Sequence, residues 1–406
     1  MPGIADYEPV VGKNIITELR LLATHLSGKV IQNINSTAVG GGVAEILNRM
    51  VPLLQELGVD GRWDVIKGGE RFFQATKRFH NALHGSFEEV TDDDFTAFLE
   101  TSEQNKKDMN LYGDIVFVHD PQPVELIERR SQMQSKWIWR CHIDLSSPSP
   151  RVWNFLVPYI NQYDAAVFSA PVFSQKLLIR QFLISPSIDP LSDKNKELPD
   201  EFIRSVLDKY QITNDRPIIT QVSRFDYLKD PLGVIDAFRL VRKYIRCQLV
   251  LVGGTATDDP QALEVVEQVR NKAGGGPDIH ILFIPPGSDL EINALQRASD
   301  VIIQKSIKEG FGLTLTEALW KAKPVVASTV GGIPLQIKHR YSGLLCHSNE
   351  GAAQLIRQLL NNPEYGKRLG RNGKEHVRQN FLLTRHLREY MLLFLSVFNK
   401  EDTIHL

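Results

Sequence analysis

The sequence predicts an α/β protein of two domains, each with a doubly wound parallel sheet and helices on both faces. Its 406 residues suffice for two domains at roughly 100–200 residues each. Short β-branched runs alternate with segments of helical period along most of the chain, which is typical of parallel sheets. The alternation is interrupted once, at residues 185–199, where three prolines stand among polar residues. Such a break indicates a linker between two domains.

Each half of the chain supplies its own strands and helices. In the first half we expect strands at Lys29–Asn35, Asp114–His119, Trp137–Ile143 and Ala165–Ser169. The helices expected between them are Val43–Leu57, Phe72–His84, Asp93–Met109 and Arg151–Gln162. In the second half the expected strands are Pro217–Val222, Gln248–Val252, His280–Ile284, Val301–Gln304 and Pro324–Ala327. The expected helices are Pro231–Tyr244, Pro260–Lys272, Glu291–Ala298 and Leu313–Ala322.

Composition excludes several classes of protein. The chain is 42% hydrophobic and 23% charged, which excludes a disordered or fibrous protein. Lys and Arg number 47 against 48 Asp and Glu, and this net charge of −1 argues against binding to nucleic acid or anionic membrane. The first residues lack the basic-then-apolar layout of a signal peptide, and the three cysteines are far apart. We therefore expect a cytoplasmic protein with buried, reduced thiols.

The glycines Gly40, Gly41 and Gly42 follow the first expected strand and precede a helix. They would let backbone N–H groups approach an anion at the helix N-terminus. A tight turn that requires positive φ is the structural alternative. The GxGxxG pattern is not completed, which argues against an NAD-dependent oxidoreductase.

A second candidate is the segment Ser223–Asp230, which follows the first strand of the second half. Its two cations, Arg224 and Lys229, lie where they can converge on a phosphate, the first through a planar fork and the second as a point charge. The alternative is a solvated loop in which Asp226 and Asp230 are local partners. The position at the carboxyl end of a parallel strand favours the functional interpretation.

The strongest signal is the segment Lys305–Ala318, which again joins a strand to a helix. Gly310 and Gly312 would let the backbone approach a ligand closely. The N–H groups of Leu313 and Thr314 would lie free at the helix start, where a phosphate is favoured.

Two carboxylates, Glu309 and Glu317, bracket this turn. Carboxylates accept hydrogen bonds well from sugar hydroxyls, so a phosphate site with paired carboxylates indicates a nucleotide sugar. The structural alternative is an exposed loop acid at Glu309 and a solvated helix residue at Glu317.

The motif EGFGLTLTE, with SRFDYLKD about 85 residues earlier, resembles the retaining GT-B glycosyltransferases of family 4. The triple glycine, the segment WRCHID and the linker SPSIDPL are most similar to the trehalose glycosyltransferring synthases, with the fungal-type trehalose phosphorylases as close relatives. This resemblance covers essentially the whole chain. It implies a GT-B fold of two Rossmann-like domains facing a deep cleft. Residues 1–190 would form the acceptor-side domain and 191–383 the nucleotide-sugar domain, with a last helix at about 384–398 packing back on the first.

The resemblance also implies roles for the cationic and backbone groups. Arg224 and Lys229 would neutralise the donor diphosphate, and the N–H groups of Leu313 and Thr314 would bind its distal phosphate. From the first domain, the backbone of Gly40–Gly42 would approach the phosphate and the sugar.

The sugar and ribose contacts are implied in the same way. Glu309, with the backbone of Gly310, Phe311 and Gly312, would hold the hydroxyls of the transferred glucose. Glu317 would take the ribose hydroxyls. His142 would lie beside the reacting carbon and the 6-hydroxyl of the sugar. Its structural alternative is a histidine satisfied by hydrogen bonds at a strand end.

Two acidic or imidazole patterns resemble metal sites, and we interpret both otherwise. Asp92–Asp94 follows Thr91 and opens a helix, so Thr91 and Asp94 are read as an N-terminal cap. His80 and His84 are spaced i, i+4 but lack an evident third ligand. We expect no metal site, no required cofactor and no essential Mg²⁺.

The resemblance implies a hexosyltransferase of carbohydrate metabolism that moves glucose from a nucleoside diphosphate glucose (UDP-, ADP- or GDP-glucose) to free glucose. The product would be α,α-trehalose, with the α-configuration retained. The alternatives are a trehalose phosphorylase, a family 4 transferase with another sugar or glycan acceptor, and a non-catalytic nucleotide-sugar sensor. The expected partners are the nucleotide-sugar donor and a monosaccharide acceptor, and a homodimer is left open.

Overall fold

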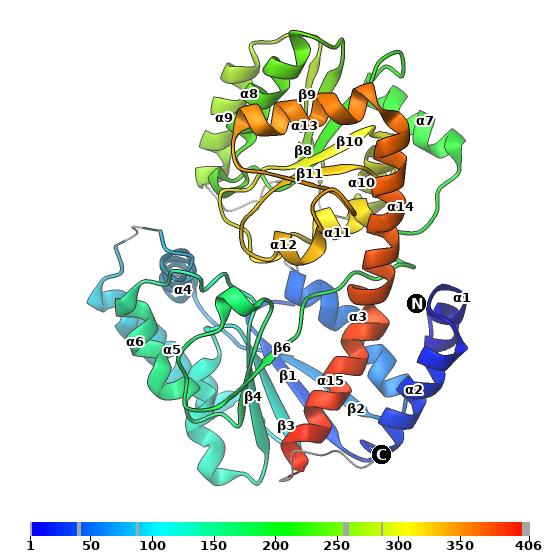
Figure 1. The fold of residues 1–406 in the computed structure, drawn as a ribbon. Coiled ribbons are helices and arrows are strands. Elements are labelled where there is room, and N and C mark those ends of the chain that lie inside the picture. Colours follow the sequence, from blue (N-terminus) through cyan, green and yellow to red (C-terminus); the bar gives the residue numbers. More distant parts are fainter. Residues whose placement is uncertain (1, 39–41, 87–88, 255–259, 286, 400–406) are drawn as a thin grey trace. The chain divides into compact units, whose positions relative to one another are not determined.

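A computed structural model describes residues 2–38, 42–86, 89–254, 260–285 and 287–399. The chain divides into two compact units, each described here by itself (Figure 1). Unit 1 comprises Met1–Ser187 and Leu383–Leu406, and unit 2 comprises Ile188–Leu382. The division lies within the proline-containing segment 185–199.

Unit 1 is built on a six-stranded parallel sheet in the order β2-β1-β3-β4-β5-β6. Its strands are β1 (Val30–Asn35), β2 (Asp60–Val65), β3 (Ile115–His119), β4 (Lys136–Cys141), β5 (Ala165–Phe168) and β6 (Arg180–Leu183). Its α-helices are α1 (Glu8–Val11), α2 (Lys13–Thr24), α3 (Gly42–Glu56), α4 (Glu70–Leu83), α5 (Asp92–Asp108), α6 (Pro150–Ile160) and α15 (Leu383–Phe398). Three short 3₁₀ helices are η1 (Ile4–Tyr7), η2 (Val124–Gln132) and η3 (Pro171–Phe173).

Unit 2 has a second six-stranded parallel sheet, in the order β12-β11-β10-β7-β8-β9. Its strands are β7 (Ile218–Val222), β8 (Gln248–Gly253), β9 (Ile279–Phe283), β10 (Val301–Gln304), β11 (Val325–Ser328) and β12 (Leu344–Cys346). Its helices are α7 (Asp200–Lys209), η4 (Tyr227–Lys229), α8 (Pro231–Arg242), α9 (Pro260–Ala273), α10 (Asp289–Ala298), α11 (Leu313–Trp320), α12 (Ile333–Gln336), α13 (Asn349–Asn361) and α14 (Pro363–Asn380).

The helix α15 returns from unit 2 to cover one face of the unit 1 sheet. The ring of Phe117 on β3 lies 5.0 Å from that of Tyr390 on α15. The buried guanidinium of Arg140 on β4 lies over the Tyr390 ring at 5.4 Å from its centroid. At the helix start, His386 Nδ1 and Ser187 Oγ are 2.9 Å apart. Unit 1 is therefore assembled from two segments of the chain that are separated by the whole of unit 2.

The core of unit 2 lies on both faces of its sheet, because successive residues of a strand point to opposite faces. On β7, Ile219 belongs to the cluster that packs under α8 and α13, whereas Ile218 belongs to the cluster with α7 and α10. Figure 1 shows helices flanking this sheet on both sides. Both faces must be apolar in such a sheet, which explains why these strands read as continuous hydrophobic runs.

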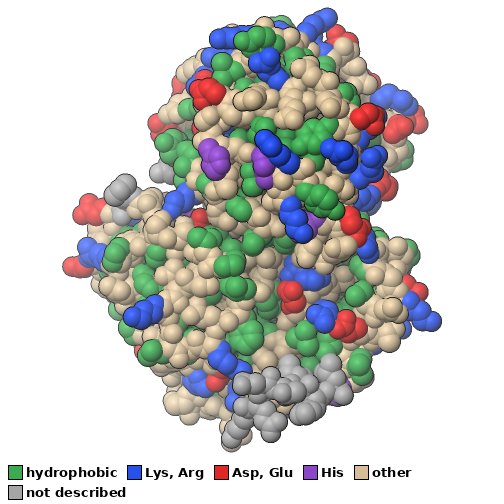
Figure 2. All heavy atoms as spheres, viewed as in Figure 1, with side chains coloured by type: hydrophobic (Ala, Val, Ile, Leu, Met, Phe, Trp, Pro, Cys, Tyr) green, Lys and Arg blue, Asp and Glu red, His purple; other side chains and the backbone are tan. Residues whose placement is uncertain are grey.

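The predicted class, a pair of parallel-sheet α/β domains, is confirmed. Every strand and helix expected from the sequence is present within a few residues of its expected bounds. The strands β2, β6 and β12 and the helices α2, α7, α13 and α14 were not predicted. All three cysteines are buried and unpaired. Among the described residues, no helix combines the length and the apolar character needed to cross a membrane. On the face drawn in Figure 2, Lys and Arg side chains are interspersed with Asp and Glu, in keeping with the near-zero net charge.

Candidate functional site

The predicted motifs of unit 2 meet at the point where the strand order of its sheet reverses. The strands β7 and β10 are neighbours although two strands lie between them in sequence, so the connections leave them in opposite directions. In open α/β sheets ligands bind at this switch point, beyond the carboxyl ends of the strands. The segment 223–230 follows β7 and the segment 305–312 follows β10. Ile307 N–H donates to the carbonyl of Leu228 at 2.8 Å, and Lys305 forms an ion pair with Asp230, so the two loops are in direct contact.

Lys229 and Glu309 form an ion pair within these loops. The Lys229 Nζ lies 2.7 Å from Glu309 Oε2, and both side chains are largely buried. The same oxygen accepts from Ser306 Oγ at 3.0 Å and from Gln304 Nε2 at 3.3 Å. Within the described part of the chain, Glu309 Oε1 takes part in no hydrogen bond. The carboxylate is thus fixed through one oxygen and has the other available to accept from a ligand. The interpretation of Glu309 as an exposed loop acid is wrong, because the residue is only 7% exposed.

Arg224 is held differently from Lys229. Its side chain is 61% exposed and donates to Asp226 Oδ2 at 3.1 Å. Asp226 in turn caps η4 by accepting from Leu228 N–H at 2.8 Å. The loop approaches β8 so closely that a Cβ on Gly253 would lie 1.8 Å from the carbonyl oxygen of Ser223. Only glycine fits at this position, and the close approach fixes the place from which Arg224 projects.

The loop after β10 leads into α11 in the way the sequence predicts. Gly312 has φ of 87°, a left-handed conformation that favours glycine, and the helix begins at Leu313. The first N–H groups of a helix, here those of Leu313 and Thr314, have no carbonyl one turn earlier to bond, so they are suited to an anion. The Phe311 ring is buried and packs against Phe381 at 5.5 Å, so this residue can offer a ligand only its backbone.

Glu317 lies on α11 with only 3% of its surface exposed. Its interpretation as a solvated helix residue is therefore wrong. One turn later, Lys321 Nζ donates to the Glu317 carbonyl at 3.2 Å and to Asn195 Oδ1 at 3.1 Å. Burial lowers the pKa of Lys321 to about 7, against the opposing effect of the Glu317 charge. The structure thus places the two predicted carboxylates on the loop and on the helix that follow β10.

The candidate residues of unit 1 follow its central strands. His142 comes directly after β4, and its backbone N–H donates to Asp120 Oδ1 at 2.7 Å. Its ring nitrogen Nε2 lies 3.2 Å from Nδ1 of His119, the last residue of β3. Burial, reinforced by the charge of Arg140, holds the pKa of His142 well below its ordinary value. Of the predicted glycines, Gly42 is the first residue of α3, and Gly40 and Gly41 lie outside the described residues.

Sequence reasoning missed His119 and Asp120. Asp120 has φ of 65°, an uncommon conformation for a non-glycine residue, directly at the carboxyl end of β3. Burial raises the pKa of its carboxyl group to about 6, against the effects of the His142 N–H and of Arg140. The available signal was the polar pair His119-Asp120 directly after the apolar residues of β3.

The structure also describes the two sequence patterns that we rejected as metal sites. Thr91 caps α5 by accepting from Asp94 N–H, and the Asp94 carboxylate accepts from Thr91 N–H at 2.9 Å, which confirms the capping interpretation. His80 and His84 are partly buried on and just after α4, with ring centroids 4.6 Å apart.

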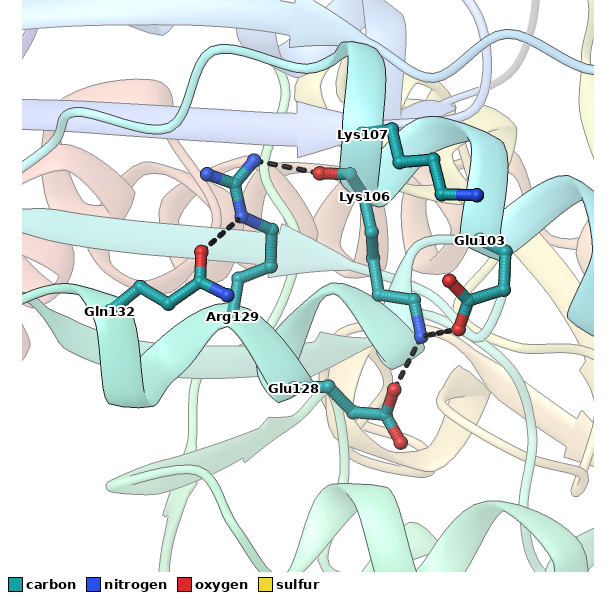
Figure 3. Close-up of a pocket in the computed structure, with 6 residues that line it drawn as sticks. All are labelled: Glu103, Lys106, Lys107, Glu128, Arg129 and Gln132. Carbon is teal, nitrogen blue, oxygen red and sulfur yellow. Dashed lines mark hydrogen bonds and ion pairs between the residues drawn. The ribbon is translucent and has the colours of Figure 1, made fainter.

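A separate charged pocket lies on unit 1, away from the predicted residues. In the described ranges, one group of three acidic side chains could hold a cation: Glu103, Glu125 and Glu128. The ammonium of Lys106 lies among them and bonds to all three, as Figure 3 shows for Glu103 and Glu128. Burial alone would lower the pKa of Lys106, but these three bonds outweigh it and raise the pKa above its ordinary value. Lys106 itself therefore supplies the positive charge at this cluster.

Comparisons with known proteins place the chain in a family. A family model described as trehalose synthase, N-terminal domain, matches residues 33–175, and one described as glycosyl transferases group 1 matches residues 203–376. The trehalose synthase of Thermococcus litoralis is 43% identical over 399 residues, which cover 97% of each chain. A trehalose phosphorylase of Grifola frondosa is 31% identical over 408 residues, which cover 86% of this chain and 54% of the fungal one.

The solved structure of an α,α-trehalose-phosphate synthase (UDP-forming) from Burkholderia vietnamiensis shares the fold. Its TM-score is 0.73 at 15% sequence identity, over 92% of this chain and 99% of that chain. The fold and the family matches define a GT-B glycosyltransferase, a hexosyltransferase with two Rossmann-like domains. Within that class, the chain belongs to the trehalose synthase family.

Proposed function

We propose that this protein transfers glucose from a nucleoside diphosphate glucose to free glucose and forms α,α-trehalose with retention of the α-configuration. The observation that carries the proposal is the contact between the loops after β7 and β10. That contact brings Arg224, Lys229, Glu309 and the start of α11 to one switch point, in a chain 43% identical to a trehalose synthase.

The donor diphosphate is the group on which negative charge develops as the bond to glucose breaks. Arg224 and Lys229 present two cations to it, and the N-terminus of α11 adds free N–H groups and the positive end of the helix dipole. Groups fixed in advance against a developing charge are usually the largest single contribution to catalysis. Because these groups supply positive charge, we propose that the reaction needs neither Mg²⁺ nor another cofactor.

The carboxylates are proposed to recognise hydroxyl groups of the donor. Glu309 Oε1 would accept from the transferred glucose, while Oε2 stays bonded to Lys229, Ser306 and Gln304. Glu317 would accept from the ribose hydroxyls. In unit 1, His142 would contact the glucose beside its reacting carbon. The acceptor in this proposal is a second, free glucose.

The decisive experiment incubates the protein with UDP-, ADP- or GDP-glucose and unlabelled monosaccharides, in phosphate-free buffer, and identifies the product and its anomeric configuration by NMR. We expect α,α-trehalose from at least one donor with glucose as acceptor. A parallel reaction supplies trehalose and inorganic phosphate without nucleotide. If only this second reaction proceeds, the protein is a phosphorylase and the proposal is overturned. A product with another sugar, and none with glucose, would overturn the acceptor assignment.

A further inference from the structure

The imidazole of His142 is the end of a chain of hydrogen bonds that connects four neighbouring strands of unit 1, in the order β2-β1-β3-β4. Asn33 on β1 donates through Nδ2 to the carbonyl of Arg62 on β2 at 3.1 Å. Its Oδ1 lies 3.2 Å from Nε2 of His119 at the end of β3. The Nδ1 of His119 lies 3.2 Å from Nε2 of His142, which follows β4. Asn33 and His119 are buried, at 3% and 1% exposure, whereas His142 is only partly buried.

The direction of each bond in this chain is determined by its far end. The Arg62 carbonyl can only accept, so the amide nitrogen of Asn33 must face it and the amide oxygen must face His119. That oxygen can only accept as well, so His119 carries a proton on Nε2.

Both imidazoles are neutral in this environment, so each carries a single ring proton. Burial, with the charge of Arg140, lowers the pKa of His119 to about 3. Burial, Arg140 and His119 together lower that of His142 well below its ordinary value. With its proton on Nε2, His119 has an unprotonated Nδ1 that accepts from the neighbouring ring. The proton of His142 is then on Nε2, and its Nδ1 is unprotonated.

We propose that Asn33 and His119 are positioning residues that hold His142 as its Nε2–H tautomer, so that Nδ1 is presented as a hydrogen-bond acceptor for a sugar hydroxyl. Within the described residues, His142 Nδ1 takes part in no hydrogen bond. The bond from the His142 backbone N–H to Asp120 fixes the backbone of the residue, and the His142 ring is stacked on the His119 ring with centroids 5.5 Å apart. The identity of the hydroxyl as one on the transferred glucose rests on the proposed function, whereas the tautomer does not.

The test is ¹⁵N NMR of the full chain labelled at its histidine rings, recorded without substrate. Two variants of similar size separate the roles of His119. His119→Asn retains an acceptor at the position of Nδ1, and His119→Leu removes it. His386→Phe is the control, because His386 is another buried imidazole of unit 1 and bonds to Ser187 instead.

We expect His142 to be protonated on Nε2 and unprotonated on Nδ1 in the wild type, in His119→Asn and in His386→Phe. In His119→Leu we expect a mixture of tautomers and a kcat/KM lower by about 2- to 13-fold, the effect of one neutral hydrogen bond. A His142 protonated on Nδ1, or on both nitrogens at neutral pH, would overturn the proposal even if no variant folds. An unchanged tautomer and unchanged kcat/KM in His119→Leu would overturn it as well. If the tautomers are as expected but no trehalose is formed, the proposed function fails and the positioning role stands.

Discussion

Lys229 Nζ lies 2.7 Å from Glu309 Oε2, although 80 residues separate the two in sequence. The cation proposed for the diphosphate and the acceptor proposed for the glucose are thus joined in one ion pair. Substitution of either residue therefore disturbs the other, and their separate contributions to catalysis cannot be obtained from single variants.

Arg224→Ala is the cleaner probe of the diphosphate, because this side chain is exposed. We expect turnover to fall by ~10²–10³, the usual effect of removing one fixed charge-stabilising group. The free energy of unfolding should change by less than about 0.5 kcal/mol, as for other surface substitutions. Arg246→Ala is the matched control, since Arg246 is also exposed in unit 2 and pairs with Asp215 at 3.2 Å. Steady-state kinetics and urea denaturation give both values, and near-normal turnover of Arg224→Ala would remove it from the site.

The ion pair itself predicts non-additive stabilities. Lys229→Met leaves the buried Glu309 carboxylate without its cation and should cost about 3 kcal/mol or more, as for other broken buried pairs. The double variant Lys229→Met/Glu309→Gln removes both charges, so it should lose less stability than the sum of the two single variants. Urea denaturation of the wild type, the two single variants and the double variant gives the free energy by which the two charges are coupled. Strictly additive losses would show that the pair is not coupled.

Glu317→Gln tests recognition of the donor ribose without opening a cavity at this buried position. Hydrogen bonds to a charged group contribute roughly 1.5–3 kcal/mol, so we expect nucleoside diphosphate to bind about 10- to 150-fold more weakly. Glucose affinity should not change. Glu364→Gln, at an exposed residue of α14, is the control. Calorimetric titration decides the matter, and equal nucleotide affinities in wild type and Glu317→Gln would contradict the ribose assignment.

Activity is expected to survive a strong chelator, because in the proposed function Arg224, Lys229 and the α11 N-terminus supply the positive charge for the leaving group. The measurement is the initial rate of trehalose formation after dialysis against EDTA, with and without added Mg²⁺. A rate that is abolished by EDTA and restored by the metal would refute this prediction.

Acid should destabilise the protein partly through His119. Burial lowers its pKa from 6.5 to about 3, so between these values the unfolded chain binds a proton that the native protein does not. Stability therefore falls as pH decreases through this range, by up to about 1.4 kcal/mol per pH unit. Asp120, whose pKa burial raises from 3.8 to about 6, acts in the opposite direction over its own range.

The contribution of His119 is isolated by comparing the wild type with His119→Asn. Between about pH 7 and about pH 5, the wild type should lose roughly 2 kcal/mol more of its free energy of unfolding than the variant does. Urea denaturation at the two pH values measures both losses. Equal losses would show that His119 is protonated in the native state.

The sequence predicted the central strands and missed β2, β6 and β12, each at an edge of its sheet. An edge strand pairs on one side only and is more exposed, so it carries polar residues that weaken the hydrophobic signal. The sequences of β2 (DGRWDV) and β6 (RQFL) are examples, whereas β12 (LLC) is apolar but only three residues long. The strand β9 is also an edge but reads IHILF, and its apolar pattern was sufficient.

The motif residues of unit 2 were predictable because each lies in a loop that follows a strand or in the helix that the loop leads into. The chain Asn33–His119–His142 was not, because it depends on the spatial order β1-β3-β4. Strand order is set by packing of the whole sheet and has no local signature. The burial of Glu317, which is only 3% exposed, has no local signature in the sequence either.

The assembly of unit 1 from residues on both sides of unit 2 has a consequence for biosynthesis. A ribosome synthesises the whole of unit 2 before α15, whose Tyr390 and His386 contact Arg140 and Ser187 of the earlier segment. Domains generally fold as units during synthesis, so unit 2 can reach its native state first. The apolar face of the unit 1 sheet, which includes Phe117, then stays without the α15 residues that cover it until the intervening chain has been made. In the nascent chain, the segment that is translated first is thus the last to be completed.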